Sequence, residues 1–369
     1  MIIIVALVAL FAYAALVAST TSVVTSTITT TSGGSTIVVT KSSSVWQSAS
    51  EYPLVVDGGL GVGGQQCVNS TVYIYCIGGQ DINAGPRNNI YSSNPLSFSS
   101  VNLSSWTTGS NSYPQDIDGQ SCFYYSGNVY CVAGTYDDAG DDVNSSYYAS
   151  LSNGQVSGWK STTAYPVPAD TLSCVPSSNY VYCVGGTVEP GGLNASATPS
   201  GAVWFAPLTS SGIGNWSTTS SYPSGVYYPD CYASQGYIYC IGGSDANGNA
   251  VSSVYYASLS STGVGAWTGT TAYPAQLSSQ SCVIVSSIIY CIGGEGNSGS
   301  YSSSVYFATV SSSGVGAWTQ SADYPDSTAT ICAFSSGYLY CVGGFDGSSS
   351  GFTPEVNYAS LSSIASSTT

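Results

Sequence analysis

Six pairs of cysteines constrain the fold of this chain more than any other feature. Every pair has the form Cys-x8-Cys, and no cysteine is left over. The pairs are Cys67 with Cys76, Cys122 with Cys131, Cys174 with Cys183, Cys231 with Cys240, Cys282 with Cys291, and Cys332 with Cys341. Each pair lies in a repeated unit with a tryptophan, a Tyr-Pro step, a glycine doublet and an aromatic run. A repeat of fixed period indicates one supersecondary unit used six times.

The length of the unit selects the kind of repeat. Successive units begin 51 to 60 residues apart and show no helical periodicity. A four-stranded blade of a β-propeller needs about 50 residues, whereas ankyrin and leucine-rich repeats are much shorter. The sequence therefore predicts an all-β ring of six blades.

The cysteine spacing predicts a hairpin with a bridge across it. With a two-residue turn, residues nine apart face each other on the two strands. Ser126-Gly127 and Ser336-Gly337 fall at such turns, where glycine accepts the positive φ that a tight hairpin requires. The cysteines then occupy a non-hydrogen-bonded pair, where the strands are closest. We expect six local disulfides, one per blade. Zinc ligation is disfavoured, because zinc sites prefer shorter spacings.

The repeat resembles the kelch family of β-propellers over residues 46 to about 361. The residues that carry the resemblance are Tyr-Ile-Tyr-Cys-Ile-Gly242-Gly243, Val254-Tyr255-Tyr256 and Gly265-Ala266-Trp267, with equivalents in all units. Ala133-Gly134 departs from the doublet, and paired cysteines are not a general kelch feature. The resemblance implies that the cysteine hairpin forms strands a and b, the aromatic run strand c, and the tryptophan run strand d.

The order of strands predicts how the ring closes. The last unit ends at strand c near Leu361 with no tryptophan after it, and Trp46 has no strands a to c before it. Residues 44 to 54 should therefore supply strand d of the last blade, which removes the exposed sheet edges. The predicted propeller covers residues 44–361, followed by a C-terminal tail at 362–369.

The N-terminal segment predicts export. Residues 1–18 are apolar and suit an export signal, a membrane anchor or a short helix that assembles into a filament. Residues 19–43 are rich in Ser and Thr and are predicted to be a linker. Oxidised cysteines also predict an extracellular or cell-surface location. Five sequons would then be candidate glycosylation sites: Asn69, Asn102, Asn144, Asn194 and Asn215.

Charged residues make up 6% of the chain, which contains no histidine. A surface of hydroxyls and amides changes little with pH, so we hypothesise an acidic habitat. The absence of histidine excludes a Ser-His-Asp triad and the histidine ligands of a copper oxidase. One arginine cannot form the cluster that a sialidase uses, and paired cysteines leave no thiol nucleophile. We therefore expect no enzyme activity and no cofactor other than calcium, and the net charge of −15 opposes nucleic-acid binding.

Most of the 18 acidic residues fall in the predicted b–c and d–a connections, which share one face of a propeller. Their mutual repulsion should raise carboxyl pKa values. The densest run, Asp137, Asp138, Asp141 and Asp142, is a candidate calcium site, with a weaker one at Asp116 and Asp118.

The expected function is an extracellular binding or structural module for adhesion, with a carbohydrate or a cell-surface protein as partner. One alternative is a filament or surface-layer subunit that self-assembles through residues 1–18. The second is a glycoside hydrolase, with Asp170 and Asp230 as the carboxylate pair.

Overall fold

A computed structural model describes residues 23–32, 35–53, 62–70, 72–81, 85–94, 106–136, 141–188, 198–347 and 351–367. The apolar segment 1–18 lies outside these residues, so the expected N-terminal helix stays a prediction. Within the described part of the chain, no helix is long and apolar enough to cross a membrane.

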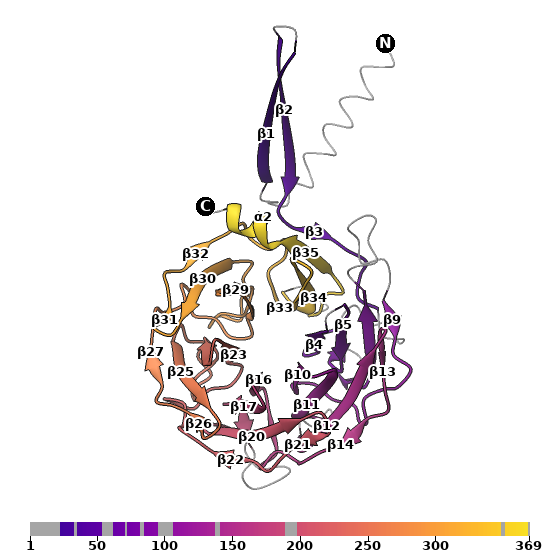
Figure 1. Ribbon diagram of the computed structural model, residues 1–369, viewed down its shortest axis with the longest axis vertical. Helices are drawn as coiled ribbons and strands as arrows, with labels where there is room; N and C mark the ends of the chain where they lie inside the picture. The colour runs from indigo at the N-terminus through magenta and orange to yellow at the C-terminus, as the bar shows by residue number, and fades with distance from the viewer. Residues whose placement is uncertain are drawn as a thin grey trace.

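The described residues form a ring of six antiparallel sheets, which confirms the predicted six-bladed propeller (Figure 1). In blades 1 to 3 the strands a to d are β4 (Gln66–Asn69), β5 (Ile74–Ile77), β8 (Ile90–Ser93) and β9 (Thr107–Thr108); β10 (Ser121–Tyr125), β11 (Asn128–Thr135), β12 (Asp142–Ser152) and β14 (Lys160–Ser161); and β16 (Ser173–Ser177), β17 (Tyr180–Val184), β20 (Val203–Thr209) and β22 (Ser217–Thr218). In blades 4 to 6 they are β23 (Asp230–Ser234), β24 (Tyr237–Ile241), β25 (Val254–Ser260) and β27 (Thr268–Gly269); β28 (Ser281–Val285), β29 (Ile288–Ile292), β30 (Val305–Ser311) and β32 (Thr319–Gln320); and β33 (Thr328–Ser335), β34 (Tyr338–Asp346), β35 (Val356–Ser360) and β3 (Gln47–Ser48).

Short strands extend the blades at their outer strands and loops. In four blades a two-residue strand pairs with the end of strand c: β13 (Gln155–Val156), β21 (Gly212–Ile213), β26 (Gly263–Val264) and β31 (Gly314–Val315). The connections of blades 1 and 3 carry β6 (Gln80–Asp81) and β7 (Gly85–Pro86), and β15 (Ala169–Asp170), β18 (Thr187–Val188) and β19 (Thr198–Pro199).

Each blade has the disulfide-bridged hairpin predicted from the cysteine spacing. The two cysteines of each pair are direct partners across strands a and b, with Cα atoms 4.0 to 4.1 Å apart. Ser126 and Gly127 both have positive φ, 48° and 85°, as expected for a tight two-residue turn. The described residues contain no free cysteine.

All six predicted disulfides are confirmed, and each is local to one blade. From blade 1 to blade 6 they join Cys67 to Cys76, Cys122 to Cys131, Cys174 to Cys183, Cys231 to Cys240, Cys282 to Cys291, and Cys332 to Cys341. No disulfide among the described residues joins one blade to another.

The ring closes with the N-terminal strand, as predicted. β3 pairs with β35 through Gln47 opposite Tyr358, and so completes the last blade (Figure 1). Trp46 contacts Tyr324 edge to face, with ring centroids 4.9 Å apart. The same Tyr–Trp contact recurs at the other five seams: Tyr52–Trp106, Tyr113–Trp159, Tyr165–Trp216, Tyr222–Trp267 and Tyr273–Trp318.

The glycine doublets are close contacts between blades. The Gly186 N–H donates to the Val226 carbonyl of the next blade at 2.8 Å. Its neighbour Gly185 has φ +68°, and a Cβ there would lie 2.5 Å from the same carbonyl oxygen. The doublet is therefore glycine for two reasons, its left-handed backbone and the approach of the neighbouring chain.

Two segments at the ends of the predicted propeller contain secondary structure of their own. In the predicted linker, β1 (Val23–Ser32) and β2 (Ser35–Ser44) form a hairpin that stands away from the ring (Figure 1). Alternating β-branched Thr, Val and Ile favour strands in such a segment. In the predicted tail, α2 (Leu361–Ser366) begins at Ser360, whose side chain accepts the Ser363 N–H. Ile364 is fully buried, so α2 covers the closing seam.

We predict that Trp46→Ala opens the closing seam first, because Trp46 precedes the short closing strand and its side chain is buried. Loss of a buried tryptophan costs about 3–5 kcal/mol. Hydrogen exchange should accelerate in β3 and β35 while blades 2 to 4 stay protected. Trp267→Ala, which removes the same contact at an internal seam, is the matched control. Uniform acceleration around the ring in Trp46→Ala would contradict the closure described above.

We predict that Gly185→Ala destabilises the protein more than Gly236→Ala. Both glycines have left-handed φ, +68° and +79°, which costs alanine about 1–2 kcal/mol. A Cβ at Gly236 meets nothing within 4 Å, whereas a Cβ at Gly185 meets the Val226 oxygen. The free energy of unfolding in denaturant should fall about 3 kcal/mol or more for Gly185→Ala. Equal losses of unfolding free energy in the two variants would show that the seam accommodates the added methyl group without destabilisation.

Candidate functional site

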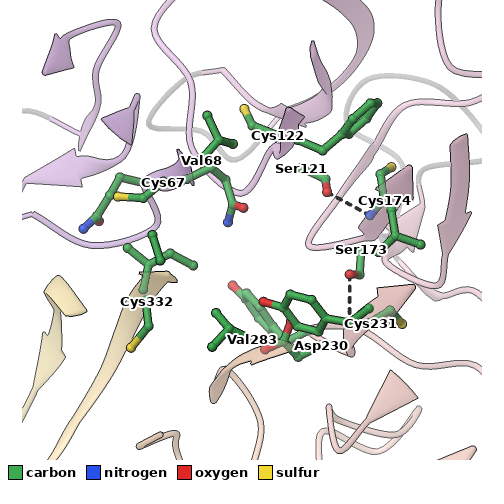
Figure 2. Close-up of a pocket in the computed structure, with 18 of the residues that line it drawn as sticks. Cys67, Val68, Ser121, Cys122, Ser173, Cys174, Asp230, Cys231, Val283 and Cys332 are labelled. Carbon is green, nitrogen blue, oxygen red and sulfur yellow. Dashed lines mark hydrogen bonds between the residues drawn. The ribbon is translucent and has the colours of Figure 1, made fainter. Parts of the chain in front are cut away.

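A cavity lies on the axis of the ring. Its volume is about 510 Å³, and strands a of all six blades contribute to its lining. Figure 2 shows the inner cysteines and their neighbours arranged around it. The volume is in the range of small-ligand sites. No lysine or arginine lines it among the described residues.

The two cysteines of a bridge have different positions relative to this cavity. Five of the six strand-a cysteines line it: Cys67, Cys122, Cys174, Cys231 and Cys332. The strand-b cysteines do not line it and are completely buried behind strand a: Cys76, Cys131, Cys183, Cys240, Cys291 and Cys341. The disulfides therefore attach the cavity wall to the core of each blade and offer no thiol to a ligand.

The cavity wall is tied together by hydrogen bonds between blades. The Cys174 N–H donates to Ser121 Oγ at 2.9 Å, and the Cys231 N–H donates to Ser173 Oγ at 3.1 Å (Figure 2). The same bond joins Cys332 to Ser281. These serines each precede the first cysteine of a blade, so a repeated sequence position makes a repeated bond.

Buried glutamines support the remaining seams. Gln65 Nε2 donates to the Val342 carbonyl, which joins the last blade to the first. Gln120 and Gln280 donate in the same way to the strands b of the blades before them. The glutamines therefore bond the wall through Nε2, whereas Oε1 of Gln120 and of Gln280 is buried without a hydrogen-bond partner among the described residues.

Asp230 occupies the serine position in blade 4. Its Oδ2 accepts the Cys282 N–H, as the serines do in other blades. Burial raises the pKa of Asp230 to about 8, although hydrogen bonds from Cys282 and Tyr232 act in the opposite direction. The carboxyl group is therefore mostly protonated at neutral pH. It is a neutral acid in the cavity wall.

The mouth of the cavity is formed by residues in the left-handed backbone region. Gly64 and Gly119 have φ of 70° and 61°, and the equivalent positions in the next three blades are Thr171, Tyr228 and Ser279, with φ of 52° to 53°. A bulky residue in this region is uncommon and strained, and such strain is concentrated at functional sites. Tyr228 also exposes 44% of its surface, and no other large hydrophobic residue among those described is so exposed.

Two carboxylates lie beside this mouth. A Cβ built on Gly64 would be 3.4 Å from Asp118 Oδ2, and one built on Gly119 would be 3.6 Å from Asp170 Oδ2. Each carboxylate thus lies over a glycine of the preceding blade. The Thr135 hydroxyl is 3.4 Å from Asp170 Oδ2. Burial raises the pKa of Asp118 to about 6.

The b–c and d–a connections share one face, as predicted. Short bridges pair them within single blades: Asp118 with Thr135 in blade 2, Tyr227 with Ser244 in blade 4, and Ser278 with Glu295 in blade 5. The expected cause of the raised carboxyl pKa values was wrong, however. Burial is the largest cause at Asp118, Asp230, Asp326 and Glu355, and neighbouring charges come second where they contribute at all.

The predicted calcium site is only partly described. Asp137 and Asp138 lie outside the described residues, whereas Asp142 is buried and Thr135 donates to it at 3.1 Å. The described residues contain no group of three acidic, cysteine or histidine side chains placed to hold a metal. Calcium binding stays a prediction.

The sequons have mixed outcomes. Asn69, Asn144 and Asn215 are exposed, as a glycan acceptor must be. Asn102 and Asn194 lie outside the described residues. Glycosylation itself stays a prediction.

Sequence reasoning missed the role of Tyr228 and the environment of Asp230. Alignment of the six units could have shown that Asp230 departs from the repeat, because the residue before the first cysteine is Ser in three of them. The same alignment places Tyr228 where other units have Gly64 and Gly119, and that replacement is the available signal for strain. Asp170 and Asp230 were both singled out in advance as a carboxylate pair, and the structure places Asp170 beside the mouth and Asp230 in the cavity wall.

The comparisons with known proteins show the fold. No family model matches the chain, and a search of curated proteins gives no match. Among solved structures the chain is similar to YjhT, with a TM-score of 0.64 and 13% identity over 83% of this chain and 95% of that one. This likeness supports a β-propeller.

The expectation that the chain is not an enzyme was wrong as an inference. The β-propeller fold that the chain shares with YjhT can carry many different functions, so the architecture is compatible with catalysis. The exclusion rested on missing histidine, thiol and arginine groups, and carboxylates remain. Asp170 at the mouth and the protonated Asp230 in the wall are such groups.

We predict that stability falls as the pH rises through the range in which the buried carboxyls ionise. The folded-state pKa values of Asp118 and Asp230, about 6 and 8, exceed unfolded values near 4. The native state therefore binds more protons between these limits. Its extra stability is complete below about pH 4 and is lost as the pH passes about 6 and then 8.

Denaturant unfolding from pH 3 to 9 measures this slope. The decline due to Asp230 should be on the order of 3–5 kcal/mol and should disappear in Asp230→Ser, which introduces the serine found at this position in three other blades. Asp245→Asn is the control, because backbone hydrogen bonds lower the pKa of the exposed Asp245. A slope that survives in Asp230→Ser would assign it to other groups.

Proposed function

We propose that this protein is an extracellular or cell-surface recognition module that binds a neutral saccharide at the mouth of its central cavity. Tyr228 carries the proposal: a tyrosine held exposed, on a strained backbone, at the edge of the cavity. An aromatic ring offers an apolar face to sugar C–H groups and a polar edge to hydroxyls. The six disulfides support an oxidising, extracellular location.

Charge restricts the chemistry of the ligand. The mouth has the carboxylates Asp118 and Asp170, and no lysine or arginine among the described residues lines the cavity. An anionic sugar would meet like charges at the mouth, and the described lining of the cavity offers no basic side chain to balance them. Sugar hydroxyls, in contrast, can donate to carboxylates in charge-assisted hydrogen bonds. The chemistry therefore favours a neutral ligand.

The cavity also changes character along its length. Gln, Ser and Asp side chains line the end near the mouth, and Val175, Val283 and Phe334 line it beyond the cysteines. A pyranose ring likewise has polar edges and apolar faces. The amphipathic lining supports a saccharide over a purely apolar ligand.

We propose in addition that the fold belongs to the kelch type of propeller. The glycine doublets at the seams and the tryptophan strands support this assignment. Assembly through residues 1–18 is retained as the alternative role, and imaging of native cell-surface material for filaments tests it.

We predict that Tyr228→Gly loses saccharide binding without loss of stability. Relief of the left-handed backbone stabilises the folded state by about 1–2 kcal/mol. The greater conformational freedom of glycine in the unfolded chain offsets about 0.5–1 kcal/mol of this gain. The free energy of unfolding should stay at or above that of the wild type. Affinity in calorimetric titrations with glucose, galactose and mannose should fall at least tenfold, about 1.4 kcal/mol.

Ser336→Gly is the matched control, because it relieves a left-handed backbone of the same φ, 52°, at an exposed hairpin turn outside both cavity linings and keeps the aromatic ring. Its affinity should stay close to that of the wild type. Equal affinity in Tyr228→Gly, or no binding of any neutral sugar by the wild type, would refute the proposal. Cleavage of oligosaccharides by the wild type that is lost in Asp170→Asn would assign a hydrolase function instead.

A further inference from the structure

We infer that a second binding subsite lies beside the first, in a groove between blades 4 and 5, and that the ligand is an extended neutral oligosaccharide lying across Tyr228. This inference rests on the proposed saccharide site and specifies its ligand. The groove is a cavity of about 180 Å³ on the face that carries the mouth. Blades 4 and 5 are neighbours in the ring (Figure 1).

The two cavities have a common wall. Tyr228 and Ser279 line both the central cavity and the groove. Both have left-handed backbones, with φ of 52° and 53°. A ligand that passes from one cavity to the other therefore crosses the wall formed by Tyr228 and Ser279, and we place it over the exposed tyrosine. This arrangement gives the strained Tyr228 a contact with two consecutive sugar units rather than one.

The groove is too small for a complete ligand. Its 180 Å³ lies below the range of about 300–1,000 Å³ that is typical of small-molecule sites, whereas the central cavity lies within that range. The groove fits part of a longer molecule whose remainder occupies the central cavity.

The loops that form the groove are held in place before any ligand binds. Asn297 accepts the Ala250 N–H and donates to the Ala250 carbonyl, which ties the loop of blade 5 to that of blade 4. Asp245 Oδ1 accepts the N–H groups of Asn247 and Asn249. A preorganised groove loses little entropy when a ligand binds.

The lining of the groove suits sugar hydroxyls. Ser244, Ser278 and the acidic Glu295 line it, together with the backbone of Gly296. Tyr227 packs beside Tyr228, with ring centroids 5.6 Å apart, so an aromatic pair forms one wall. No lysine or arginine lines the groove among the described residues, which repeats the charge pattern of the mouth.

Gly296→Tyr tests the groove by filling it. A Cβ on Gly296 would make ordinary contacts, 3.6 Å from the Ser300 carbonyl oxygen and 3.8 Å from that of Gln276, and its φ lies outside the left-handed region. Gly347→Tyr is the matched control, because Gly347 is exposed and a Cβ there meets nothing within 4 Å. Glu295→Gln is a second variant that removes the charge and keeps the shape.

Titrations use β-1,4-linked glucose and mannose oligomers of one to five units. In the wild type, affinity for one of the two series should rise at least tenfold between one unit and three or four. Gly296→Tyr should abolish this gain and leave the affinity for the single unit unchanged, Glu295→Gln should reduce the gain, and Gly347→Tyr should retain it.

The outcomes separate the two proposals. A wild type that binds single units with no gain in affinity for longer chains overturns the second subsite and leaves the first intact. A gain that survives in Gly296→Tyr also overturns it, because the chain then extends elsewhere. A wild type that binds no oligomer of either series overturns both proposals.

Discussion

The fold depends on contacts that join each blade to the next. At every seam a tyrosine of one unit meets the tryptophan of a neighbouring unit edge to face, and a side chain near the cavity bonds to the neighbouring backbone. Disulfides, in contrast, act within blades. The blades are thus cross-linked internally, and the ring is held together by noncovalent seams. The hydrogen bonds of the seams also join the segments that form the wall of the axial cavity.

The seams explain why the fold could be predicted from the sequence and the site largely could not. The Cys-x8-Cys spacing predicts a hairpin, and the tryptophan marks strand d, because both are local patterns repeated six times. Trp46 has no strands a to c before it, and this predicts the closure. The site arises where one unit departs from the repeat. Blade 4 has Asp230 where three other blades have serine, and it has Tyr228 where the other blades have Gly, Thr, Ser or Ala. The properties of both residues depend on their three-dimensional surroundings. Burial beside Cys282 raises the pKa of Asp230, and neighbouring strand-a segments hold Tyr228 in its strained backbone. Asp170 could be named in advance only because few chemically active residues exist in the chain.

The burial of several carboxyl groups helps to explain the low charge content of the chain. Burial raises the pKa of several carboxyl groups, and each of them destabilises the folded state less when it is protonated. With few cations to pair with, the protein uses hydroxyl and amide bonds at the places where ion pairs are common in other proteins. Ser121, Ser173 and Gln120 serve this role in the cavity wall. These bonds do not titrate, which agrees with the hypothesis of an acidic habitat.

The two-residue strand β3 has a mechanical consequence. It connects the ring to the β1–β2 hairpin, which projects from it, and it is also the strand that closes the last blade. If the N-terminus is tethered to a surface, tension on the protein passes through β3 before it reaches any disulfide. The Trp46–Tyr324 contact and the two residue pairs of β3 then bear the load, so the closing seam yields while the bridged hairpins remain intact. A tethered ring of this kind extends at one defined point and can close again when the force is released.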